Sequence, residues 1–205
     1  LLDGDSSLQL TTKLESAGYV DLTLQVLRKF GIKIREVREK IAEAEKTAFQ
    51  KCKEATPSES SDTPDTSSEN CLIRYEIPGN QIYREPAGLK VEGDWSNAAF
   101  WLVAGALGGD ITCTGLDPDS TQRDKEIITV LEKMGAEIER KNTSYHIAGN
   151  GVLLHGETVS AAQFPDLVPV MAVAMTGASG TSTITDAQRL HIKESDRLAT
   201  VCDFL

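Results

Sequence analysis

The sequence predicts an α/β fold built from stacked units of helices and strands. Two internal repeats support this prediction. The stretch 26–34 resembles 130–138, and the helix and strand that end at Thr114 resemble the pair that ends at Thr185. The unit combines a helix that is apolar all round with an amphipathic one, so the first type is expected inside and the second at the periphery. Such repeats favour sheets arranged around a core of buried helices.

Alternation of apolar and polar residues predicts most of the strands. Helices are predicted where apolar residues recur every three to four positions, and Gly31 and Gly135 follow two of them, as C-cap glycines do. The predicted strands are 7–11, 32–35, 71–77, 110–114, 136–139, 144–148 and 181–185, and the predicted helices are 22–30, 95–107, 124–134, 167–178 and one that begins at Leu198.

Residues 36–70 are predicted to be a polar insertion. The stretch from Arg35 to Glu54 is highly charged, which fits a solvated helix with a thin apolar stripe. Residues 56–70 hold eight Ser or Thr and four acids but no base, a composition typical of disorder. We therefore expect a tolerated surface insertion.

Composition places the chain among globular proteins and excludes several partners. Of the 205 residues, 40% are hydrophobic but only 5% aromatic, so the core should be aliphatic. The net charge of -10 argues against a nucleic acid or an anionic membrane as partner. The sequence shows no signal peptide and no long apolar run, and its four cysteines are scattered, which favours reduced thiols and a cytoplasmic location. Both ends fall inside predicted elements, so we expect a piece of a longer chain.

The stretch Gln188–Arg197 gathers the cations that bear most on function. Lys193 and Arg197 are four positions apart and are expected to share one face of the first turn of the last helix. Cations there oppose the helix dipole, at a cost of about 0.3–1 kcal/mol each, but they suit a phosphate or carboxylate ligand. The alternative is local ion pairing, of Lys193 with Asp196 and of Glu194 with Arg197.

Five segments form a specific combination, although each alone is weak: Leu14–Thr23, Val91–Ala99, Leu131–Ala136, Pro165-Asp166 and Lys193–Arg197. Together they resemble the enolpyruvyl transferases, in particular the branch that acts on shikimate 3-phosphate. The resemblance implies an inside-out α/β barrel fold with two lobes, each made of three βαβαββ units. Residues 1–91 would close one lobe, and residues 92–205 would open the second, truncated at its C-terminus.

The resemblance implies transfer of the enolpyruvyl group from phosphoenolpyruvate to the 5-hydroxyl of shikimate 3-phosphate, with no metal or organic cofactor. That reaction needs a base, an acid and cations for the phosphates and the carboxylate. Asp166 matches the base position, Glu194 the acid position and Arg197 a position that binds phosphoenolpyruvate. The positions that match contacts to shikimate 3-phosphate are Ser16, Tyr19, Asp166, Arg189 and Lys193, and Lys193 is also a catalytic position.

Simpler interpretations of these residues stay open. Asp166 fits a favourable first-turn acid, Ser16 a capping serine and Tyr19 a core tyrosine. Arg189 departs from the asparagine that some family members carry there, which puts its role in doubt.

Two other functions also stay open. One is the sister reaction on UDP-N-acetylglucosamine, and the other is a non-catalytic interaction protein derived from the fold. The Lys193–Arg197 string and the Ser16-x-x-Tyr19 spacing favour the shikimate branch. The resemblance covers about half of a family member, so we expect the isolated chain to be inactive. The larger enzyme is expected to be a monomer that binds small molecules.

Overall fold

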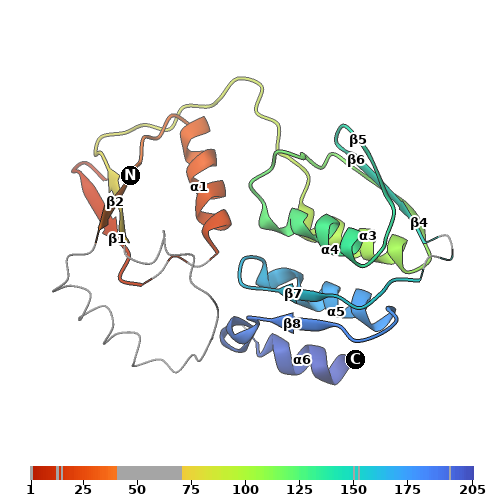
Figure 1. The fold of residues 1–205 in the computed structure, drawn as a ribbon. Coiled ribbons are helices and arrows are strands. Elements are labelled where there is room, and N and C mark those ends of the chain that lie inside the picture. Colours follow the sequence, from red (N-terminus) through yellow and green to blue (C-terminus); the bar gives the residue numbers. More distant parts are fainter. Residues whose placement is uncertain are drawn as a thin grey trace. The chain divides into compact units, whose positions relative to one another are not determined.

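The computed structural model describes residues 2–12, 14, 16–40, 71–149, 151, 153–193 and 195–205 (Figure 1). These residues form two compact units. The first comprises Leu1–Glu15 and Thr23–Gly88, and the second comprises Ser16–Leu22 and Leu89–Leu205. Most of the predicted polar insertion, residues 41–70, lies outside the described residues. Among the described residues, no helix is both long enough and apolar enough to span a bilayer.

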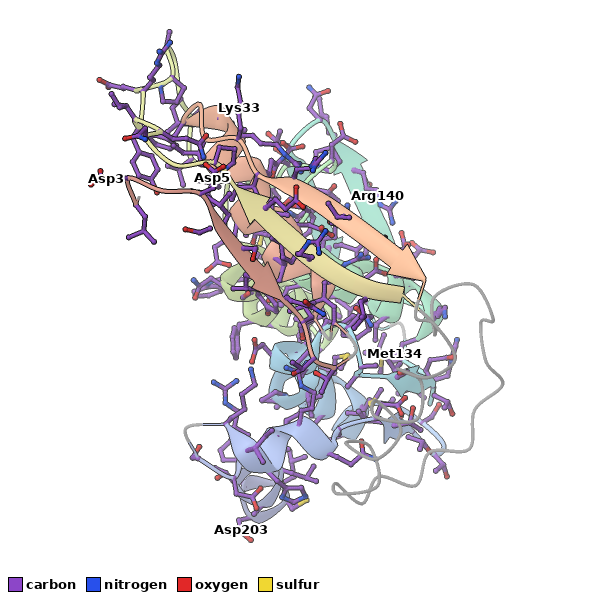
Figure 2. All side chains as sticks on the ribbon, turned by 90° about the vertical axis from the view of Figure 1, so that its left-hand side faces the viewer. Asp3, Asp5, Lys33, Met134, Arg140 and Asp203 are labelled. Atoms are coloured by element: carbon purple, nitrogen blue, oxygen red, sulfur yellow. The ribbon has the colours of Figure 1, made fainter. Side chains whose placement is uncertain are left out.

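A three-stranded antiparallel sheet is the centre of the first unit. Strand β3 (Cys71–Ile77) lies between β1 (Ser6–Gln9) and β2 (Arg35–Lys40), as Figure 2 shows. Helix α1 (Ala17–Lys29) contributes its later turns to this unit and its first residues, up to Leu22, to the second. The sequence predicted β1 and β3 at these places.

Two predictions near Arg35 are wrong. The strand predicted at 32–35 begins only at Arg35, and the charged helix predicted from that residue onward is a strand over 35–40. The reason is pairing with β3, which places Arg35 opposite Glu76 and Val37 opposite Arg74. Hydrogen bonding along a neighbouring strand overrides a helical charge pattern.

A second antiparallel sheet and its helices form one layer of the second unit. Strand β6 (Ser144–Ala148) lies between β4 (Asp110–Thr114) and β5 (Ile138–Lys141), so β4 and β5 run parallel to each other. They are joined through η1 (Arg123–Glu126) and α4 (Ile127–Lys133). The sequence predicted this hairpin and its helix, with the first strand of the hairpin two residues early.

A parallel βαβ unit completes the second unit. Strand β7 (Thr158–Ser160), which the sequence pattern missed, pairs with β8 (Thr183–Thr185). The connection runs through η2 (Pro165–Leu167) and α5 (Val168–Thr176), and the chain continues into η3 (Gln188–Ile192) and α6 (Arg197–Phe204) (Figure 1). Asp203 lies near the far end of α6 (Figure 2). The mixed α/β fold is as predicted.

Helix α3 (Trp95–Ala106) carries the core of the second unit. Asp94 caps it, accepting a hydrogen bond from the backbone N–H of Ser96, and the helix packs against α5, β4 and β6. The sequence predicted this helix to be buried throughout, but Phe100 and Trp101 are 59% and 62% exposed. The helix is apolar all round, but the described elements cover only part of its surface.

Candidate functional site

Asp166 occupies a rigid position at the start of α5. It is the middle residue of η2, and the residues on either side of it, Pro165 and Leu167, are fully buried. Proline fixes φ and suits the first turn of a helix. The Asp166 side chain itself keeps 27% of its surface exposed. The turn therefore anchors the backbone in the core while leaving the carboxylate open to solvent.

Two cations share one oxygen of Asp166. Arg197 Nη1 donates to Asp166 Oδ1 at 2.7 Å, and Lys193 Nζ lies 3.1 Å from the same oxygen. Both cationic side chains are 28% exposed. Partly buried ion pairs contribute more to the free energy of folding than fully exposed ones do.

Lys193 and Arg197 meet by a route that the sequence pattern did not predict. Lys193 is extended, with φ -75° and ψ -175°, and α6 begins only at Arg197. The two residues therefore do not share a helix face. Asp196 caps α6 by accepting from Ala199 N at 3.0 Å, and it also contacts His191 at 2.8 Å. The predicted local pairing of Lys193 with Asp196 is replaced by the distant Asp166.

Tyr19 is the third donor to Asp166. Its hydroxyl donates to Asp166 Oδ2 at 2.8 Å, although the two residues are 147 positions apart. Burial, followed by the hydrogen bond to Asp166, raises the pKa of Tyr19, so the phenol stays protonated and keeps donating. Burial alone would raise the pKa of Asp166, but the bonds from Tyr19 and Lys193 and the two cations hold this pKa below its ordinary value.

Ser16 and Arg189 form a second contact of the same unit. Arg189 Nη1 donates to Ser16 Oγ at 2.6 Å, and Ser16 is 8% exposed. Ser16 has a φ of 51°, a left-handed conformation that is uncommon for residues other than glycine. The structure thus brings together six of the seven predicted positions in two contacting groups. The seventh, Glu194, lies outside the described residues.

One acid of this region, Asp124, is not among the positions that the sequence pattern predicts. It lies in η1 and is only 2% exposed, with its Oδ2 accepting a hydrogen bond from the Ser96 hydroxyl. Burial raises the pKa of Asp124, and the charges of Asp166 and Asp94 add to this rise. An acid at the start of a predicted helix normally indicates only a favourable dipole interaction. The sequence around Asp124 therefore does not distinguish it from an ordinary first-turn acid.

The assembled side chains suit an anionic ligand with a hydroxyl group. Lys193, Arg189 and Arg197 are cationic in a chain whose net charge is -10, and arginine binds carboxylates and phosphates in a bidentate manner. The ionised Asp166 is an acceptor for a hydroxyl proton. Among the described residues, no group of three or more His, Cys, Asp or Glu residues is placed to hold a metal ion.

Comparison with protein families gives one consistent result. Residues 65–205 match the family model of EPSP synthase (3-phosphoshikimate 1-carboxyvinyltransferase). The 3-phosphoshikimate 1-carboxyvinyltransferase of Clostridium kluyveri is 41% identical over 201 residues, which cover 98% of this chain and 39% of that protein. The protein of the same name from Clostridioides difficile is 36% identical over 200 residues, which cover 98% and 38%. The chain thus spans about two fifths of the length of the curated relatives it matches.

Solved structures share the fold at lower sequence identity. An EPSP synthase from Acinetobacter baumannii superposes with a TM-score of 0.61 at 22% identity, covering 98% of this chain and 39% of that one. The enolpyruvyl transferase NikO from Streptomyces tendae superposes with a TM-score of 0.53 at 17% identity, covering 89% and 36%. At these identities the structures support the fold class, and the chemistry has to come from the site.

Proposed function

Because the chain belongs to the EPSP synthase (3-phosphoshikimate 1-carboxyvinyltransferase) family, we propose that it forms part of an enzyme of that activity. The enzyme transfers the enolpyruvyl group of phosphoenolpyruvate to the 5-hydroxyl of shikimate 3-phosphate and releases phosphate. The observation that carries the proposal is the Asp166 carboxylate, which receives Tyr19 on one oxygen and both Lys193 and Arg197 on the other.

Each residue has a role that its chemistry supports. Asp166, held ionised by its donors, takes the proton of the attacking hydroxyl. Arg197 binds phosphoenolpyruvate through its planar guanidinium group. Lys193 contacts shikimate 3-phosphate and stabilises charge that develops during the reaction. Glu194 is the acid that protonates the vinyl carbon, a role carried over from the matching position of the family.

The remaining positions hold shikimate 3-phosphate. Tyr19 presents a neutral hydroxyl at the same carboxylate, and Ser16 and Arg189 contact each other within the same unit. We assign residues 1–91 to the end of one lobe and residues 92–205 to the beginning of the other. The monomeric state and the cytoplasmic location stay predictions.

The sister reaction on UDP-N-acetylglucosamine is less supported. The matched family model and the matched relatives carry the name of the enzyme that acts on 3-phosphoshikimate. If the protein were non-catalytic, the contacts of Tyr19, Lys193 and Arg197 with Asp166 would contribute only to local stability.

The test is turnover by the intact, full-length protein that contains this chain. We expect phosphate release that requires both shikimate 3-phosphate and phosphoenolpyruvate, and a loss of about 10²–10⁴-fold in kcat for Asp166→Asn. The control is Asp203→Asn, an exposed acid of α6, which should keep normal turnover. Turnover with UDP-N-acetylglucosamine instead would favour the sister enzyme, and full activity of Asp166→Asn would refute the base assignment.

A further inference from the structure

Asp124 is a buried acid with one oxygen that lacks a hydrogen-bond partner among the described residues. Its Oδ2 accepts the Ser96 hydroxyl, whereas its Oδ1 is buried and unpaired. Buried polar atoms are nearly always hydrogen-bonded. An acceptor left open at 2% exposure is therefore available to a donor that arrives in another state of the site.

The charged groups that act on Asp124 include one candidate for that donor. Asp166 and Asp94 repel its carboxylate, and Lys193 attracts it. Asp124 also acts electrostatically on Tyr19 from α1. Of these neighbours Lys193 is the cation, and its ammonium group has three donors on a flexible stem.

Asp166 is crowded in the arrangement described here. Its Oδ1 receives Arg197 at 2.7 Å and Lys193 at 3.1 Å. If Asp166 accepts the proton of a substrate hydroxyl, as the proposed function requires, one of these donors has to loosen. Lys193 has the longer contact and the more adaptable side chain, so it is the donor that moves.

We infer that Asp124 is a positioning residue for Lys193: its open Oδ1 receives the Lys193 ammonium when substrate occupies Asp166. This inference rests on the proposed function. Asp124 would keep the positive charge beside the reacting groups through its contact with Lys193, and it would not bind substrate itself. Removing its charge should lower kcat and leave the KM values nearly unchanged.

The test combines kinetics and a double-mutant cycle in the intact protein. We expect Asp124→Asn to lower kcat about tenfold, with the KM values for both substrates changed less than threefold. In a Lys193→Ala background the same change should cost less than twofold, since the two residues act through one contact. The matched control is Asp119→Asn, an exposed acid of the preceding loop, which should behave like the wild type.

An equal loss in both backgrounds would show a purely structural role and overturn the inference, and so would a normal kcat. A second readout does not depend on turnover: the carboxyl ¹³C signal of Asp124 followed against pH with shikimate 3-phosphate bound. Lys193→Ala should move its titration midpoint upward, and an unchanged midpoint would overturn the inference. If the wild type shows no turnover but the midpoint moves, the proposed function fails while the contact between Lys193 and Asp124 stands.

Discussion

Asp166 contacts two segments that are far apart in the sequence, the start of α1 and the stretch 193–197. Its carboxylate binds Tyr19 from α1, Lys193 from the loop after η3 and Arg197 from α6. Residue type and spacing singled out Lys193 and Arg197, whereas Asp166 and Tyr19 were singled out by the resemblance to the enolpyruvyl transferases. Their mutual geometry was not predictable: Lys193 and Arg197 meet at Asp166 and not along a helix face. The buried Asp124 was missed because burial is a property of the fold.

Asp166→Asn should destabilise the protein by about 1–3 kcal/mol at pH 7, because hydrogen bonds to a charged group are lost. The folded-state pKa of Asp166 lies below its ordinary value. The stabilisation is therefore present above the unfolded pKa of about 3.9 and is lost as the pH falls through the folded value. Urea unfolding at pH 7 and pH 3 measures the gap between wild type and variant, with the exposed Asp110→Asn as control. An equal gap at both pH values would contradict this prediction.

Tyr19→Phe should lower the free energy of unfolding by about 1 kcal/mol, because one hydrogen bond to Asp166 is lost while the ring stays. The pKa of Tyr19 is raised, so the stabilising phenol is fully present below the unfolded pKa of about 10 and is lost only at still higher pH. Urea unfolding between pH 7 and pH 9 should show a constant difference. Tyr83→Phe, at an exposed tyrosine of the first unit, is the matched control and should change little.

The helices and strands of the second unit illustrate where local pattern suffices. Strands β4 and β6 lie where alternation predicted them, and α3 and α5 lie where small apolar residues cluster. Strand β7 escaped prediction because it has only three residues, and its pairing with β8 is what makes it a strand. The strand at 35–40 was not predicted for the same reason, since its hydrogen bonds come from the distant strand β3.

Gly105→Ala tests the packing of α3 on its sheet. A Cβ at this position would clash with Ile147 Cγ2 and lie 3.0 Å from Ile147 O. Alanine favours a helix by up to about 1 kcal/mol, whereas overpacking a core costs about 1–3 kcal/mol. We therefore expect a net loss of about 1–2 kcal/mol in denaturant unfolding. Ala104→Ser, at the exposed neighbour, should stay within about 0.5 kcal/mol of the wild type, and a stabilised Gly105→Ala would contradict the packing argument.

At the scale of the whole molecule, charge and local function oppose each other. The chain carries a net charge of -10, which repels anions at long range. Lys193 and Arg197 nevertheless converge at Asp166, where partial burial reduces screening. Anions should therefore bind this protein through Lys193 and Arg197, and their affinity should depend on these two side chains more than on the net charge.

Inorganic phosphate should stabilise the protein more than chloride at equal ionic strength. At ten times its Kd, a ligand that binds only the folded state adds about 1.4 kcal/mol, which thermal unfolding detects. Arg197→Ala should remove most of the phosphate effect. Arg140 lies on β5, is labelled in Figure 2 and pairs with Glu132 of α4. The Arg140→Ala variant should keep the stabilisation by phosphate. Equal losses in both variants would indicate nonspecific screening.

The sequence by itself determined the fold class and the positions of most elements, because periodicity is a local property, and its resemblance to the enolpyruvyl transferases singled out the candidate site residues. The tertiary structure decided the strand at 35–40, the pairing of β7 with β8, the meeting of Tyr19 and Lys193 at Asp166, and the burial of Asp124. Each of these depends on which distant backbone or side chain supplies a hydrogen bond or excludes water. No window of neighbouring residues contains that information.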